Sequence, residues 1–185
     1  MALNLPPIQT ARLLIRTVQA SDLPDLLTVN GDDAVTQHLP YATWQSLEDG
    51  QAWLQRMQTL SQTGTAQQCV LHHRGMNQVV GTLLLFKHDE ASARLEVGYV
   101  LGRACWGQGL MHEALRAVLQ HALTQAGIRR VEAEVNPDNA PSCRLLQRLG
   151  FVLEGRARQR WTAKGHTYDT LLFGLLASDW PGAVL

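Results

Sequence analysis

The sequence predicts an α+β domain with a mixed, mostly antiparallel sheet of about six to seven strands and about four helices. The chain has 185 residues, which suits one hydrophobic core, and no linker or internal repeat divides it. We therefore expect a single domain over residues 1–185. Its apolar fraction of 45% and charged fraction of 17% exclude a disordered chain. Strand-like and helix-like patterns follow in an order that favours local strand pairing with two crossover helices.

The first half of the chain is expected to contain one strand, two helices and three further strands. Ser21 can cap the first helix, which ends at Gly31, and Ser46 begins a capping box before the second. The four strand-like runs are 12–16, 68–71, 79–86 and 95–101. A hairpin turn over 73–77 joins the second and third of these runs.

The second half is expected to contain a helix, a strand, a second helix and two final strands. These elements are a helix between Gly109 and Gly127, a strand over 131–135, a helix between Asn139 and Gly150, and strands over 151–161 and 168–175. Asn139 has the side chain of an N-cap, and Pro141 fits the first turn of the helix that follows. Residues 131–135 alternate strictly between apolar and charged side chains, as a half-buried strand does.

Charge and cysteine content narrow the class of protein. Lys plus Arg and Asp plus Glu both number 16, and this neutrality does not favour a nucleic-acid or membrane-surface partner. No apolar run reaches the ~18–20 residues of a membrane span, and residues 1–7 lack the features of a secretion signal. The three cysteines are widely spaced, so neither a disulfide framework nor a metal site is indicated. We expect a cytoplasmic protein without a metal.

The junction at Trp106-Gly107-Gln108-Gly109 lies between an expected strand and an expected helix. Its glycines allow close approach to the backbone, and the first N–H groups of a helix attract anions. A diphosphate would suit such a site. The P-loop pattern is absent, and His112 stands where a dinucleotide fingerprint needs its third glycine. Two glycines alone also occur as a turn or packing device.

Residues 98–101 and 106–114 together resemble the acetyl-coenzyme A motif of the GCN5-related N-acetyltransferase (GNAT) superfamily. More narrowly, the chain resembles the ribosomal-protein N-acetyltransferase (RimJ/RimL) branch. Further short matches in the same order are 10–16, 139–142, 149–151, Asp169 and 177–180. The resemblance therefore extends over almost the whole chain. It implies a GNAT-type fold whose central parallel strands splay apart.

The resemblance implies acetyl-coenzyme A as cosubstrate. The implied contacts are Tyr99, Val100, Leu101, Cys105, Trp106, Gly107, Gln108, Gly109, Leu110, Met111, Asn136 and Asn139. Backbone N–H groups from Cys105 to Met111 would receive the pyrophosphate, and the strand end near Val100 would pair with the pantetheine arm. The motif often begins with Gln or Arg where this chain has Ala104. Whether Arg103 contacts the phosphates or solvent stays open.

Glu96 is the candidate general base. Acetyl transfer to an amine requires that the amine lose a proton, and Glu96 lies in an otherwise apolar strand. Partial burial there would raise the pKa of its carboxyl, which suits a base. The resemblance implies the same role. The alternative is a structural carboxylate paired with Arg94 or another arginine.

Ser142 is the candidate acid for the departing thiolate. In many members of the superfamily a tyrosine four residues further along does this work, but that position is Leu146 here. Ser142 follows Asn139 and could donate to the sulfur. The alternative is a first-turn residue that bonds a backbone carbonyl.

Two groups of residues are candidates for binding the acceptor. His38, Tyr41 and Trp44 lie between the first two helices, a region that shapes the acceptor site in the resembled branch. Arg156, Arg158 and Arg160 alternate on one expected strand, so they would share a face and could bind carboxylates. The alternative is a solvated face on which these arginines pair with Glu132 and Glu134.

Three functions are consistent with these residues. The first is acetylation of a peptide or protein N-terminus, and the second is the same chemistry on a small amine such as an amino acid, polyamine or antibiotic. The third is a coenzyme A-binding module without turnover, against which Glu96 and Ser142 argue. A homodimer could help to form a peptide groove.

Overall fold

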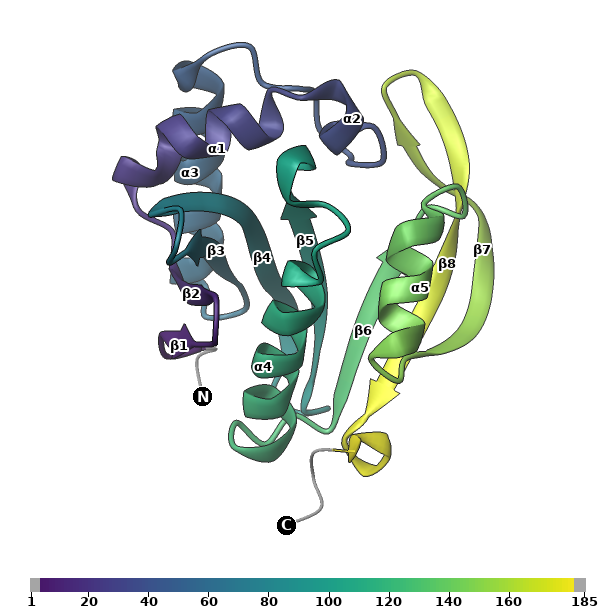
Figure 1. Ribbon diagram of the computed structural model, residues 1–185. Coiled ribbons are helices and arrows are strands. Elements are labelled where there is room, and N and C mark those ends of the chain that lie inside the picture. The colour runs from purple at the N-terminus through teal and green to yellow at the C-terminus, as the bar shows by residue number, and fades with distance from the viewer. Residues whose placement is uncertain (1–3, 182–185) are drawn as a thin grey trace.

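The computed structural model describes residues 4–181, and these form an eight-stranded sheet with five α-helices (Figure 1). The strands are β1 (Ile8–Gln9), β2 (Leu13–Thr17), β3 (Gln67–His73), β4 (Gln78–Asp89), β5 (Arg94–Leu101), β6 (Arg130–Val135), β7 (Val152–Ala163) and β8 (His166–Leu176). The helices are α1 (Leu23–Asn30), α2 (Asp33–Thr36), α3 (Leu47–Gln62), α4 (Leu110–Thr124) and α5 (Ala140–Arg148). Residues 1–3 and 182–185, the ends of the expected domain, lie outside the described residues.

The sheet has the order β1-β2-β3-β4-β5-β6-β8-β7, and its neighbours are antiparallel except for β5 and β6. These two strands pair in parallel only from Arg94 opposite Arg130 to Glu96 opposite Glu132. Beyond Glu96 the strands diverge, as Figure 1 shows between the β5 and β6 labels. The expected mixed sheet with a splayed parallel pair is confirmed.

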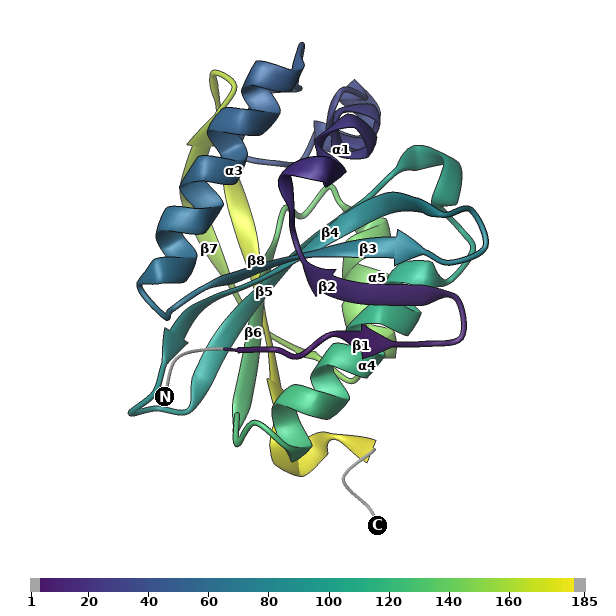
Figure 2. The ribbon, with the colours of Figure 1, turned by 90° about the vertical axis from the view of Figure 1, so that its left-hand side faces the viewer.

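Helices cover both faces of the sheet and form two apolar cores. The amphipathic helix α4 buries Leu110, Leu115 and Leu119 completely in the larger core, to which α5 contributes Leu146. Burial of one such side chain contributes about 1.5–3 kcal/mol. On the other face, α1 and α3 pack over β3 and β4 (Figure 2).

Two short elements escaped the sequence analysis. Strand β1 has two residues, and pairing of Ile8 with Ile15 of β2 defines it. Helix α2 is a single turn, capped by the Asp32 side chain, which accepts from the Ala34 N–H at 2.9 Å. Neither element is long enough to produce an apolar period, so tertiary contacts decide their conformation.

Neither a membrane-spanning helix nor a cluster of metal-binding side chains is found among the described residues. Between residues 4 and 181, no helix is long and apolar enough to cross a membrane. In the same part of the chain, no three His, Cys, Asp or Glu side chains converge in a way that could hold a metal ion.

Candidate active site

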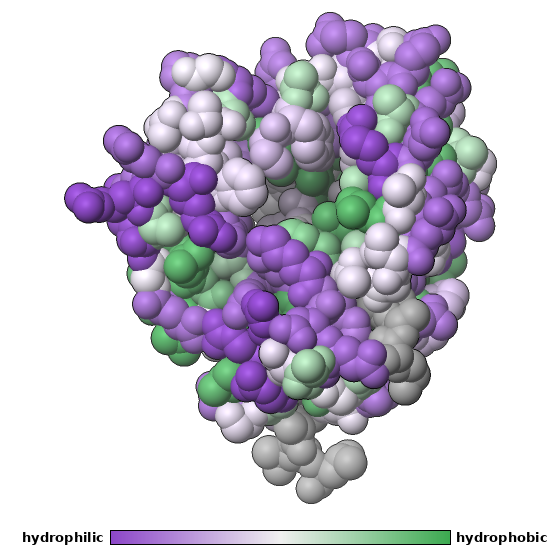
Figure 3. All heavy atoms as spheres, turned by 180° about the vertical axis from the view of Figure 1, so that it is seen from behind, coloured by the Kyte–Doolittle hydropathy of each residue, from purple (hydrophilic) through white to green (hydrophobic). Residues whose placement is uncertain are grey.

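A cavity of about 460 Å³ opens where β5 and β6 diverge. It brings together predicted site residues from separate parts of the chain: His38, Tyr41, Glu96, Tyr99, Val100, Asn136, Asn139 and Ser142. Figure 3 shows the face opposite to that of Figure 1: hydrophilic side chains cover much of this face, and paler and more hydrophobic residues border a hollow in its upper half. The divergence of a parallel pair therefore creates a site that neither strand could form alone.

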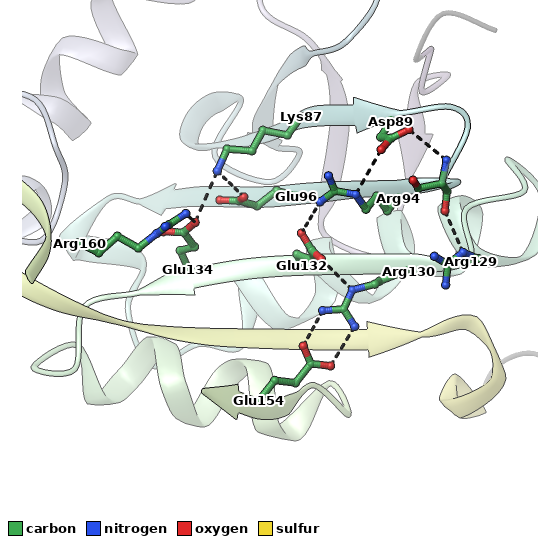
Figure 4. A network of polar contacts seen from close by, with 11 residues as sticks. Lys87, Asp89, Arg94, Glu96, Arg129, Arg130, Glu132, Glu134, Glu154 and Arg160 are labelled. Atoms are coloured by element: carbon green, nitrogen blue, oxygen red, sulfur yellow. Dashed lines mark hydrogen bonds and ion pairs between the residues drawn. The ribbon is translucent and has the colours of Figure 1, made fainter. Parts of the chain in front are cut away.

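Glu96 lies in this cavity with only 6% of its surface exposed. Burial raises the pKa of its carboxyl, while the Lys87 ammonium, 2.7 Å from Oε2, opposes this rise. Figure 4 shows Lys87 pointing at Glu96 from the neighbouring strand β4. The expected alternative, a pair with Arg94, is wrong because Arg94 turns to Glu132 and Asp89 at 3.1 and 3.5 Å.

Glu134 is a second carboxylate on the cavity wall, and the sequence analysis did not consider it as a site residue. It accepts hydrogen bonds from Arg160 at 2.8 and 2.9 Å and from the Trp161 indole at 2.8 Å. The Arg160 guanidinium lowers the pKa of Glu134 to about 2, although burial opposes it. Glu134 therefore stays ionised, 3.5 Å from Lys87.

Ser142 and Tyr99 share a hydrogen bond of 2.6 Å between their hydroxyl oxygens. The Asn139 side chain caps α5 by accepting from the Ser142 N–H at 3.2 Å, which holds Ser142 at the first turn. Burial raises the pKa of Tyr99 to about 12, so its phenol is protonated at neutral pH. A tyrosine hydroxyl thus reaches the site from β5, whereas the sequence analysis considered Tyr99 only as a cofactor contact.

The loop before α4 fits an anionic group. Gly107 and Gly109 have φ angles of +72° and +74°, in the left-handed region that favours glycine, and a Cβ at Gly107 would meet nothing within 4 Å. No side chain caps α4, so its first N–H groups keep no partner within the helix. Arg12 braces the loop by donating to the Gln108 carbonyl at 2.8 Å. A backbone of this form can accommodate an anionic group such as a diphosphate.

The free edge of β5 fits an extended arm beside the loop. Residues 97–101 pair with β4 but not with β6, so one edge of this segment is open. Part of that edge is already used, because the Trp106 indole N–H donates to the Leu101 carbonyl at 2.7 Å. Cys105, Leu110 and Met111 are buried in the core, so they can contribute to ligand binding only through their backbone.

The candidate acceptor residues divide into two groups. His38 and Tyr41 line the cavity, and Tyr41 donates to Asn30 at 3.0 Å. Burial raises the pKa of Tyr41 and lowers the pKa of His38. Trp44 does not line the cavity: it is buried in the smaller core, with its ring centroid 5.4 Å from that of Trp53. Trp53, which the sequence analysis missed, lines the cavity instead.

The expected row of three arginines on β7 is wrong. The pairing of β7 with β8 shifts between Ala157 and Trp161, and Gln159 has a φ of +49°, so the side chains do not alternate regularly. Arg160 pairs with Glu134, as the alternative of an ion-paired face expected, whereas Arg156 pairs with Asp169 and not with Glu132 or Glu134. Arg158 is exposed and is not among the residues that line the cavity.

Comparison with known proteins decides the family. A family model described as the acetyltransferase (GNAT) domain matches residues 12–152. The chain belongs to this family. An uncharacterised N-acetyltransferase, p20, of Bacillus licheniformis is 31% identical over 95% of this chain and 98% of its own length. The protein is therefore an N-acetyltransferase.

Two further similarities are to acetyltransferases whose names state a substrate. The ribosomal protein uS5-alanine N-acetyltransferase of Escherichia coli is 39% identical, over 46% of this chain and 45% of its own length. The crystal structure of spermidine N-acetyltransferase from Vibrio cholerae, in complex with CoA and spermine, superposes with a TM-score of 0.79 at 15% identity. That match covers 92% of this chain and 98% of the other, and it establishes a shared fold.

Proposed function

We propose that the protein transfers the acetyl group of acetyl-coenzyme A directly to a primary amine, and that this amine is the N-terminus of a peptide or protein. One observation carries the proposal: a buried carboxylate, Glu96, shares a cavity with the Tyr99–Ser142 hydroxyl pair. The preformed anion loop lies at the other end of the same strand β5. The proposed base, acid and cosubstrate site would thus be grouped around one diverging strand pair.

Glu96 would act as the base. An ammonium has no lone pair, so the acceptor must give a proton to the carboxylate before its nitrogen attacks the thioester carbonyl carbon. The backbone near Val100 would supply the N–H that stabilises the negative charge on the carbonyl oxygen. The raised pKa of Glu96 brings it closer to the operating pH, which suits proton transfer.

Ser142 and Tyr99 would act together on the leaving group. After attack by the neutral amine, the nitrogen of the tetrahedral centre carries an extra proton. Collapse of this centre breaks the C–S bond, and the departing thiolate can take up that proton through the Ser142 hydroxyl, which gives one proton and receives another. Ser142 Oγ can also stabilise the thiolate by donating a hydrogen bond, and Tyr99 can orient Ser142 through their 2.6 Å hydrogen bond. The Asn139 cap keeps Ser142 at the start of α5.

The partial similarity to the uS5-alanine enzyme supports a protein N-terminus as the acceptor. The shared fold with the spermidine enzyme supports the alternative, a small amine. A coenzyme A-binding module without turnover has less support, because it gives no reason to bury a carboxylate in the same cavity as the hydroxyl pair. A cytoplasmic location, the absence of nucleic-acid and membrane partners, and a homodimer are further parts of the proposal.

Two acceptor pools test the substrate class. Purified protein and acetyl-coenzyme A are incubated with short peptides that have free N-termini, or with amino acids, polyamines and aminoglycosides, and products are identified by mass spectrometry. We expect acetylation at peptide α-amines. Acetylation of small amines alone would replace the proposed substrate with the alternative, and tight acetyl-coenzyme A binding with no product from either pool would favour the binding module.

A further inference from the structure

Lys87 reaches the cavity through an irregularity in β4. Leu85 belongs to the buried core and Phe86 lines the cavity opposite Glu96, so regular alternation would turn Lys87 back toward the core. Instead, the pairing of β4 with β5 shifts between Phe86 and Asp89, and Lys87 has a φ of +50°. Lys87 therefore lines the same cavity as Phe86.

This backbone conformation is disfavoured for a lysine, and such irregularities concentrate at functional sites. The bulge directs the ammonium to a defined place: Nζ lies 2.7 Å from Glu96 Oε2 and 3.5 Å from Glu134 Oε1. It also lies 5.3 Å from the centroid of the Phe86 ring. Figure 4 shows Lys87 between the two carboxylates.

The charged groups around Glu96 come from several elements. Glu132 and Glu134 face it from β6, Lys87 from β4 and Arg160 from β7. The other titratable groups that line the cavity are His38, Tyr41, Arg56, Tyr99 and Tyr168. Arg160 is already bonded to Glu134 through two nitrogens. Lys87 is therefore the cation in direct contact with the Glu96 carboxylate.

We propose that Lys87 is a positioning residue for acetyl transfer, because its ammonium, in direct contact with Glu96 Oε2, keeps the Glu96 carboxylate ionised. The inference rests on the proposed role of Glu96 as the base. Burial and the fixed negative charge of Glu134 both favour protonated Glu96, which could not accept a proton from the amine. Lys87 opposes both effects, so the enzyme can combine a buried base with activity near neutral pH.

The first test reads the ionisation of Glu96 without any acceptor. Full-length protein labelled with 13C at the glutamate carboxyl is titrated by NMR, with Glu96→Gln to assign the signal. In Lys87→Met the midpoint of Glu96 should rise by about one pH unit, as expected for loss of an adjacent opposite charge. Lys87→Arg should keep the wild-type midpoint, and so should Arg148→Met, which removes an exposed charge from the last turn of α5.

Lys87→Gly provides a second variant that adopts a φ of +50° without strain and also removes the ammonium. It should shift the Glu96 midpoint as Lys87→Met does. A midpoint that stays within about 0.3 pH unit of the wild type in both variants would overturn the proposal, since the expected shift is at least threefold larger.

The second test reads the reaction. With acetyl-coenzyme A and an alanine-initiated peptide, the acidic limb of kcat/KM should move to higher pH in Lys87→Met, and the rate should approach that of the wild type at high pH. An equal loss at every pH would overturn the proposal, because it would indicate structural damage. Failure of the proposed function is a separate result. A Glu96→Gln variant with wild-type kcat would show that Glu96 is not the base, whereas the NMR titration would still measure the effect of Lys87 on Glu96.

Discussion

Glu96 is a carboxylate in an apolar strand, and its neighbours decide when it carries a charge. Because its pKa is raised above the ordinary 4.5, the active, deprotonated fraction is lost as the pH falls through that raised value. We expect kcat/KM to rise with pH along a limb whose midpoint lies above 4.5. Measurement of the rate across this range, with thermal unfolding as a control for folding, checks the sign. A limb governed by Glu134 would lie near pH 2 and would contradict the assignment.

The Tyr99–Ser142 pair supports a second prediction at the residue scale. Ser142→Ala should lower kcat by ~10–100-fold, because the thiolate then leaves without a proton donor. Tyr99→Phe should lower kcat less, since Ser142 remains. The KM for acetyl-coenzyme A should change little in both variants, and Ser178→Ala, in the short helix η3 (Ala177–Asp179), serves as the control. Wild-type kcat in Ser142→Ala would exclude the acid role.

Single residues differ in how far the sequence predicted their place. Glu96 and Asn139 lie where strand alternation and helix capping put them. Lys87 could not be predicted, because a bulge turns its side chain to the opposite face. The predicted place of Arg158 is wrong for the same kind of reason, because the pairing of β7 with β8 shifts between Ala157 and Trp161. The predicted place of Trp44 in the acceptor site is wrong, because a tryptophan in a loop can pack in a core as well as line a cleft. Only the tertiary packing distinguishes the two.

Among the elements, the junction of β5 with α4 was predicted directly from the two glycines between an expected strand and an expected helix. Gly107 and Gly109 both have a positive φ, and the anion site there stays a prediction. Elements with a clear apolar period were predicted close to their bounds, whereas β1 and α2 were missed because tertiary contacts define them. Apolar periodicity thus predicted the main helices and strands. The positions of irregular residues and short elements became known only from the structure.

The glycine junction gives a prediction with a matched control. Gly107→Ala should cost about 1 kcal/mol of stability from positive φ, and should also weaken acetyl-coenzyme A binding about tenfold, because the methyl group enters the open space at the loop. Gly127→Ala has the same positive φ and the same open surroundings, at the far end of α4. It should lose similar stability and keep the wild-type affinity. Calorimetric titration and thermal unfolding of both variants separate strain from binding.

At the scale of the whole molecule, an ion-pair network connects the half of the sheet that carries β7 and β8 to its centre. Arg130 bonds Glu132 and Glu154, and Arg94 continues the network to Asp89 (Figure 4). The chain has a net charge of zero, and several of its opposite charges are paired with each other on one face of the sheet. The carboxylates of these pairs, Asp89, Glu132 and Glu154, are not among the residues that line the cavity, whereas Glu134, which pairs with Arg160, is.

Ion-paired carboxylates on β6, β7 and β8 predict how stability depends on pH. The pKa values of Glu134, Glu154 and Asp169 are lowered by their arginine partners or by hydrogen bonds, so these groups stabilise the fold above their ordinary pKa values. That stability should be lost as the pH falls; for Glu134 the window runs from about pH 5 to about 2. Denaturant unfolding at several pH values should show this decline, and Glu134→Gln should flatten it. An unchanged slope in Glu134→Gln would contradict the coupling.

Thiol release from acetyl-coenzyme A by the wild type and Glu96→Gln, with an accepted amine and with acetyl-coenzyme A affinity measured in parallel, tests the role of Glu96 most directly. We expect a loss in kcat of at least ~100-fold in Glu96→Gln, with unchanged affinity for acetyl-coenzyme A. Wild-type turnover by Glu96→Gln across the pH range would contradict Glu96 as the base, because the buried carboxylate would then have no part in the reaction.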